Sequence, residues 1–189
     1  MGQRLNIEIV NGDTVLANAY YHWSAFTFPA LELTAEIVKG IDKVPSENKL
    51  EQAIALLELT GAGVDDEEWA RIESDTTGKF DELVFKEAEN RNRGLISVTE
   101  EGMQETETLE EGRVSIDLEK KTICFDVVDC LSLEEYRADF EDAPSLPVVD
   151  GIDFYNVPFS RFHELIGIIH MYEYGIRLSN GTVVLWIDG

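Results

Sequence analysis

Two short segments on either side of a polar turn most constrain the fold of this chain. Residues 114–118 alternate apolar and polar side chains, and residues 123–127 do the same after Glu119-Lys120-Lys121. A period of two residues places the apolar side chains of a strand on one face. We therefore expect a β-hairpin that packs one face against a hydrophobic core.

Similar patterns occur near both ends of the chain. Residues 5–10 alternate before Asn11-Gly12, a pair that favours a tight hairpin turn, and residues 15–23 return as a strand. Residues 171–178 and 182–187 form a second pair of predicted strands. We expect these two terminal hairpins to share one antiparallel sheet.

Helical periodicity occupies much of the remaining sequence. Apolar residues recur at helical spacing in segments 29–41, 50–57, 80–88 and 159–169, and shorter helices are expected at 65–72 and 133–140. Ser46 is the expected N-cap of the second helix. The polar, acidic run 100–112 is expected to form an exposed hairpin or a loop.

These elements predict an α+β fold, in which an antiparallel β-sheet from the N- and C-terminal hairpins has several helices packed on it. The length suits one domain over residues 1–189, with a possible subdomain boundary near 92–94.

Charge is the sequence feature that bears most on function. The chain has 38 Asp and Glu against 15 Lys and Arg, a net charge of -23 in 189 residues. Residues 97–150 contain 16 acids and 4 bases, whereas residues 1–62 contain 8 acids and 4 bases. Because self-repulsion opposes compaction, such an excess points to a role in binding partners.

The composition argues against several classes of function. Nucleic acids and anionic membranes are bound by basic patches, and the bases here are scattered. The chain has no apolar run of about 20 residues that could span a bilayer, and its first residues lack the apolar stretch of a signal peptide. We expect a cytoplasmic protein with reduced cysteines, no cofactor and no metal.

Few residues suggest catalysis. His22 lies among aromatic residues in Tyr20-Tyr21-His22-Trp23, where it is either a base or a structural residue at the end of a strand. His163 and His170 lie among apolar residues and are expected to be structural, and Cys124 has no nucleophile signature around it. Asp117, Asp126 and Asp129 lack the spacing of a calcium loop.

The acidic clusters are either solvated faces or a surface that imitates the phosphates of a nucleic acid. The second interpretation predicts a basic, nucleic-acid-binding protein or nuclease complex as the partner. The leading contacts would be Glu100, Glu101, Glu105, Glu107, Glu110 and Glu111, followed by Glu134, Glu135, Asp139, Glu141 and Asp142.

Residues 1–9, MGQRLNIEI, and residues 16–24, LANAYYHWS, resemble small uncharacterised proteins of phages and prophages of Gram-positive bacteria. The resemblance covers roughly the first forty residues and transfers no functional residue. In size and acidity the chain is also similar to phage-encoded anti-CRISPR proteins. This similarity implies an inhibitor of a host defence complex, plausibly a Cas nuclease.

Two alternatives remain at this stage. The first is a small hydrolase or nuclease that uses His22 with acidic partners. The second is a module that binds a nucleotide signal, which would need several arginines to converge in one pocket. The candidates are Arg4, Arg91, Arg93, Arg113, Arg161 and Arg177.

Overall fold

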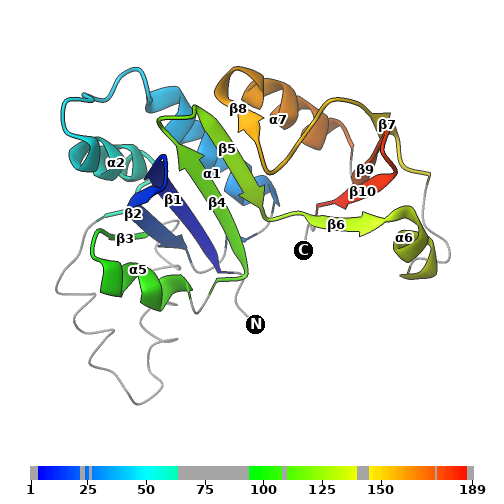
Figure 1. Cartoon of the computed structure of the whole chain (residues 1–189), viewed down its shortest axis with the longest axis horizontal. Coiled ribbons are helices and arrows are strands. Elements are labelled where there is room, and N and C mark those ends of the chain that lie inside the picture. Colours follow the sequence, from blue (N-terminus) through cyan, green and yellow to red (C-terminus); the bar gives the residue numbers. More distant parts are fainter. Residues whose placement is uncertain are drawn as a thin grey trace, which may run out of the picture.

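The computed structural model describes residues 4–21, 24–25, 27–63, 94–107, 110–139, 145–172 and 174–186. The predicted helices at 65–72 and 80–88 lie outside these residues. The fold of the described part is α+β, as the sequence indicated (Figure 1). None of its helices is long and apolar enough to cross a bilayer.

A six-stranded sheet contains the expected hairpins of the first two thirds of the chain. Its order is β3-β2-β1-β4-β5-β8. The bounds are β1 Leu5–Asn11, β2 Thr14–Tyr21, β3 Leu95–Ser97, β4 Gly112–Asp117, β5 Thr122–Asp126 and β8 Val157–Pro158. The hairpins β1–β2 and β4–β5 are confirmed, and β1 runs parallel to β4.

The C-terminal hairpin belongs to a second sheet of four strands, so the expectation of one shared sheet was wrong. Its order is β6-β10-β9-β7. The bounds are β6 Asp129–Ser132, β7 Val148–Val149, β9 Gly175–Leu178 and β10 Thr182–Leu185. Strand β1 pairs with β4 on the side away from β2, and β10 of the C-terminal hairpin pairs with β6. Alternation decides which face of a strand is buried, but it does not decide which strand lies beside it.

Three helices contribute to the hydrophobic core, together with one face of the larger sheet. They are α1 Thr27–Gly40, α2 Lys49–Glu58 and α7 Phe162–Met171, the last preceded by the 3₁₀ turn η1 Phe159–Arg161. Leu31, Leu56 and Phe162 are fully buried there beside Ile7 and Ile116. Met171 ends α7, so the predicted strand from 171 begins only at Gly175.

The N-cap of α2 also differs from the expectation. Asn48, rather than Ser46, accepts hydrogen bonds through Oδ1 from the N–H groups of Leu50 and Glu51, at 3.1 and 3.3 Å. These bonds satisfy two of the donors that a helix leaves unpaired at its start. The predicted acidic helix near 133–140 is confirmed as α6, Leu133–Asp139.

The acidic run after β3 is a helix, α5 Glu100–Glu107, and not the expected hairpin or loop. The hydroxyl of Thr99 accepts a hydrogen bond from the N–H of Gly102 at 3.2 Å. Glu100 and Glu101 in the first turn interact favourably with the positive end of the helix dipole. Thr99 followed by two acidic residues is a sequence signal for the start of a helix. The prediction of a hairpin or loop relied on the high acid content of the segment and overlooked this signal.

Candidate functional site

The second face of the six-stranded sheet carries polar side chains in register. Within each strand these residues alternate with those of the hydrophobic core. One row crosses five strands, each residue opposite the next, and we call it the polar row. Its members, from β3 to β5, are Ser97, Asn18, Glu8, Ser115 and Cys124.

A second row runs beside the first and places Arg113 near the centre of the sheet. Its members, from β3 to β5, are Leu95, Tyr20, Asn6, Arg113 and Asp126. The guanidinium of Arg113 reaches Glu110 through Nε at 3.0 Å and Nη2 at 2.5 Å. Its Nη2 also lies 3.3 Å from Glu107, and its Nη1 lies 4.0 Å from Glu8.

These carboxylates stabilise the charged form of Arg113. Burial by itself lowers the pKa of the guanidinium. The hydrogen bond to Glu110 and the negative charges of Glu8, Glu110 and Glu107 outweigh burial, so the pKa is raised. One cation is therefore shared by three carboxylates, which leaves this part of the surface negative.

Helix α5 and the segment after it are fixed to this face by hydrogen bonds. Asn18 Nδ2 donates to the Thr106 hydroxyl at 2.8 Å, and Asn6 Nδ2 donates to Glu110 at 2.9 Å. The backbone N–H of Arg4 donates to the Glu111 carboxylate at 3.0 Å. The acidic side chains of this region thus stand on a well-anchored scaffold.

Five of the six leading predicted contacts have described side chains, and they lie on α5 and in the segment that joins it to β4. Glu100, Glu101, Glu107 and Glu111 are exposed and Glu110 is half-buried. We call these five residues the acidic surface. Glu105 belongs to α5, but its side chain lies outside the described residues. A hollow of about 330 Å³ adjoins the surface, with Glu111, Asp126 and Val127 among its lining residues.

The second predicted group does not join the acidic surface. Glu134, Glu135 and Asp139 lie on α6, at the opposite end of the molecule from α5 (Figure 1). Glu135 has a local role, because its carboxylate accepts the N–H of Ser132 and this bond lowers its pKa. Glu141 and Asp142 lie outside the described residues.

The cysteines and histidines provide no catalytic arrangement within the described residues. Cys124 and Cys130 are both free thiols, and the hydroxyl of Tyr155 donates to Cys130 Sγ at 3.6 Å. His22 lies outside the described residues. His163 and His170 are exposed on α7, where the ring of His170 stacks on Phe28 at 5.2 Å.

Carboxylates do not assemble into a metal site in the described part of the chain. Oδ1 of Asp117 accepts the backbone N–H groups of Gly12, Glu119 and Lys120. Asp117 therefore holds two turns, and it does not converge with Asp126 as a cation ligand would.

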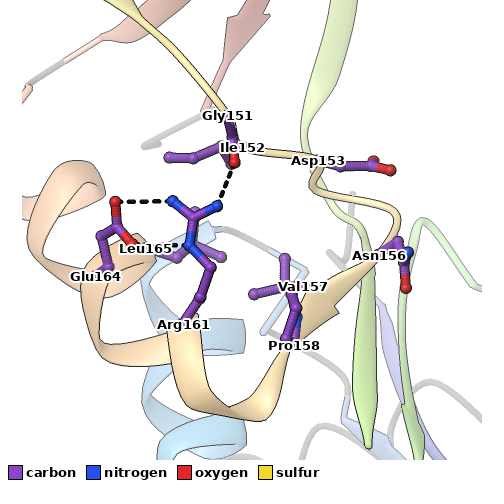
Figure 2. A pocket seen from close by; sticks show the side chains of 9 residues that line it. All are labelled: Gly151, Ile152, Asp153, Asn156, Val157, Pro158, Arg161, Glu164 and Leu165. Atoms are coloured by element: carbon purple, nitrogen blue, oxygen red, sulfur yellow. Dashed lines mark hydrogen bonds and ion pairs between the residues drawn. The ribbon is translucent and has the colours of Figure 1, made fainter. Parts of the chain in front are cut away.

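The arginines needed for a nucleotide site do not gather in one pocket among the described residues. Arg161 lines a cavity of about 170 Å³ whose floor includes Val157 and Leu165 (Figure 2). Its Nε and Nη2 each lie 2.9 Å from Glu164, and Nη1 donates to the carbonyl of Gly151. The cavity is smaller than the roughly 300–1,000 Å³ of typical ligand pockets. The guanidinium of Arg161 is also already paired with Glu164 and the Gly151 carbonyl.

Arg113 is likewise paired, on a different element, and Arg91 and Arg93 lie outside the described residues. Comparison with known proteins adds no further candidate site. No protein-family model matches the chain, and neither the curated proteins nor the solved structures include a match to it.

Proposed function

We propose that this protein is an inhibitor that binds the nucleic-acid-binding surface of a basic host protein through its acidic surface. The observation that carries the proposal is that the carboxylates of the acidic surface stand on one anchored scaffold, where Glu107 and Glu110 share the cation Arg113 with Glu8, and Glu111 accepts the backbone N–H of Arg4. Fixed side chains lose less conformational entropy on binding than mobile ones. The arrangement therefore favours complementary recognition over a purely solvating role.

The negative charge of the protein favours a partner that normally binds nucleic acid. A cleft that attracts phosphates also attracts fixed carboxylates, and the net charge of -23 accelerates the encounter. The hollow beside the acidic surface is lined by the acids Glu110, Glu111 and Asp126 and by one base, Arg113, so its net negative charge favours a lysine or arginine side chain. The same charge would repel nucleic acid itself.

The class of host protein is suggested by the resemblance of the first forty residues to phage and prophage proteins. The similarity in size and acidity to anti-CRISPR proteins favours a nuclease complex of bacterial defence, such as a Cas nuclease, as the target. Such a target would place the protein in the cytoplasm of the host cell.

The first experiment is a pull-down of the tagged protein from a Gram-positive bacterial lysate at low and at high salt. We expect a nucleic-acid-binding complex to be retained at low salt and released at high salt, because exposed charge pairs are screened. Retention of no basic protein would contradict the proposal.

The contact residues are then tested with charge-neutralising variants. A quadruple variant carries Glu100→Gln, Glu101→Gln, Glu107→Gln and Glu111→Gln. Its control removes four exposed charges elsewhere, with Glu32→Gln, Glu47→Gln, Glu58→Gln and Asp150→Asn. We expect the first variant to lose binding by at least about tenfold and the control to retain it. Equal loss in both would assign the effect to net charge alone.

A further inference from the structure

Three buried polar atoms on the sheet face beneath α5 have no hydrogen-bond partner in the described structure. They are Asn6 Oδ1, Asn18 Oδ1 and Ser97 Oγ. The three residues are only 2%, 3% and 6% exposed. Buried polar atoms in proteins are nearly always paired, so three on one face require an explanation.

The atoms lie on neighbouring strands. Asn18 is directly opposite both Ser97 and Glu8, and Asn6 lies two residues before Glu8 on the same face of β1. Adjacent strands are about 4.8 Å apart, so β3, β2 and β1 together span roughly 10 Å. One ligand of a few heavy atoms can therefore meet more than one of these atoms.

The hydrogen bonds fix which end of each amide is unpaired. Asn6 must direct its NH₂ group at Glu110, because a carboxylate can only accept. Asn18 must direct its NH₂ group at Thr106, because the Thr106 hydroxyl donates its proton to the carbonyl of Met103 at 2.9 Å. Both unpaired amide atoms are therefore carbonyl oxygens, which accept hydrogen bonds.

The charge around these acceptors is negative. Among the described ion pairs, Glu8, Glu107 and Glu110 share Arg113 as a cation, so these four groups together carry a net charge of two negative units. Glu8 is itself 9% exposed and accepts a hydrogen bond from the Ser115 hydroxyl. A ligand that satisfies the acceptors and the excess charge must be a cation that carries N–H donors.

We propose that this face binds a small nitrogen cation, of the alkylammonium or alkylguanidinium class, at Asn6, Asn18 and Ser97, with Glu8 as the counter-charge. Exposure along the polar row rises from the buried Ser97 to the half-buried Ser115 and Cys124. The cation therefore enters from the β4–β5 side, while Thr106 of α5 covers the Asn18 end. The proposal does not depend on the partner of the acidic surface.

The test measures the thermal stability of the whole protein in methylammonium, methylguanidinium and tetramethylammonium chloride at equal ionic strength. Tetramethylammonium has the same charge but no N–H donor. We expect saturable increases in Tm with the first or the second salt that tetramethylammonium does not produce. Equal shifts in Tm in all three salts would overturn the proposal, because they would show that the N–H donors of the cation make no difference. Water would then be the hydrogen-bond partner of the three buried atoms.

Ser97→Ala is the matched variant, because its hydroxyl has no partner to lose in the folded protein. We expect it to fold normally and to weaken the apparent cation affinity by about tenfold, as for a lost hydrogen bond to a charge. Ser160→Ala, at an exposed serine on η1, is the control and should respond like the wild type. An unchanged response of Ser97→Ala would also overturn the proposal.

Discussion

The backbone N–H of Gly12 donates a hydrogen bond to Oδ1 of Asp117 at 3.2 Å, although the two residues are 105 positions apart in the sequence. The same oxygen accepts the N–H groups of Glu119 and Lys120 at 2.9 and 3.0 Å. One carboxylate thus joins the β1–β2 turn to the β4–β5 turn. It stabilises the ends of the parallel β1–β4 pair on which the candidate site is built.

This arrangement predicts a pH-dependent contribution from Asp117. Burial alone raises the pKa of its carboxyl, but the hydrogen bonds outweigh burial and hold the pKa below the ordinary value of 3.8. A carboxyl with a depressed pKa in the folded state stabilises the protein above its unfolded-state pKa. That contribution is lost as the pH falls through the folded-state pKa.

We therefore expect Asp117→Asn to lower the free energy of unfolding by about 1–2 kcal/mol at neutral pH, since bonds to a charged acceptor are stronger than those to a neutral one. The difference from wild type should shrink below about pH 4. Urea denaturation across a pH series measures it, with Asp139→Asn as the exposed control. A difference that stays constant with pH would show that the charge of Asp117 has no role.

Arg113 is predicted to matter more for stability than an exposed lysine. Arg113→Met leaves Glu8, Glu107 and Glu110 without their shared cation and should cost about 2 kcal/mol. This cost is below that of a fully buried pair, because the Arg113 side chain is 31% exposed. Lys39→Met breaks only the exposed pair with Glu36 and should cost under about 1 kcal/mol.

The stability lost in Arg113→Met can come from repulsion among the remaining carboxylates or from lost packing of the arginine side chain. Thermal denaturation at low and high salt distinguishes these two causes. Added salt should recover part of the stability of the Arg113 variant, because it screens repulsion among the remaining carboxylates. A loss that is independent of salt would point to the packing of the arginine side chain.

The N-cap of α2 gives a third prediction. Asn48→Ala should lower the free energy of unfolding by about 1 kcal/mol, because two N–H groups at the start of the helix lose their acceptor. Ser46→Ala should change it by less than about 0.5 kcal/mol. Chemical denaturation of the two variants decides between the caps, and a larger effect at Ser46 would contradict the observed geometry.

The two cysteines should differ in their reactivity. Burial raises the pKa of the Cys124 thiol, and nearby carboxylates led by Asp126 raise it further. Cys130 is exposed. Because the thiolate is the reactive form, iodoacetamide should modify Cys130 before Cys124 in the folded protein. Mass spectrometry of peptides gives the order, and unfolding in urea should reduce the difference.

Local patterns determined much of the fold. The alternation in 114–118 and 123–127 specified a hairpin and the face that it buries, and Asn11-Gly12 marked the turn of another. These features depend on neighbours only a few residues apart, so the sequence displays them directly. The acidic residues that form the acidic surface were equally visible as a cluster between 100 and 111.

Long-range pairing was decided by the tertiary structure. No local pattern in residues 5–11 indicates that β4 lies beside β1. That pairing places Arg113 opposite Asn6 and its Nη1 atom 4.0 Å from Glu8. The same pairing brings Ser115 into line with Glu8, and the pairing of β3 with β2 brings Ser97 into line with Asn18. The sequence by itself determined the hairpins β1–β2, β4–β5 and β9–β10 and the negative charge, whereas the short strands β6, β7 and β8 were not predicted. The complete polar row exists only because the folded core brings two hairpins and β3 side by side, since burial of apolar faces fixes register but not the order of strands.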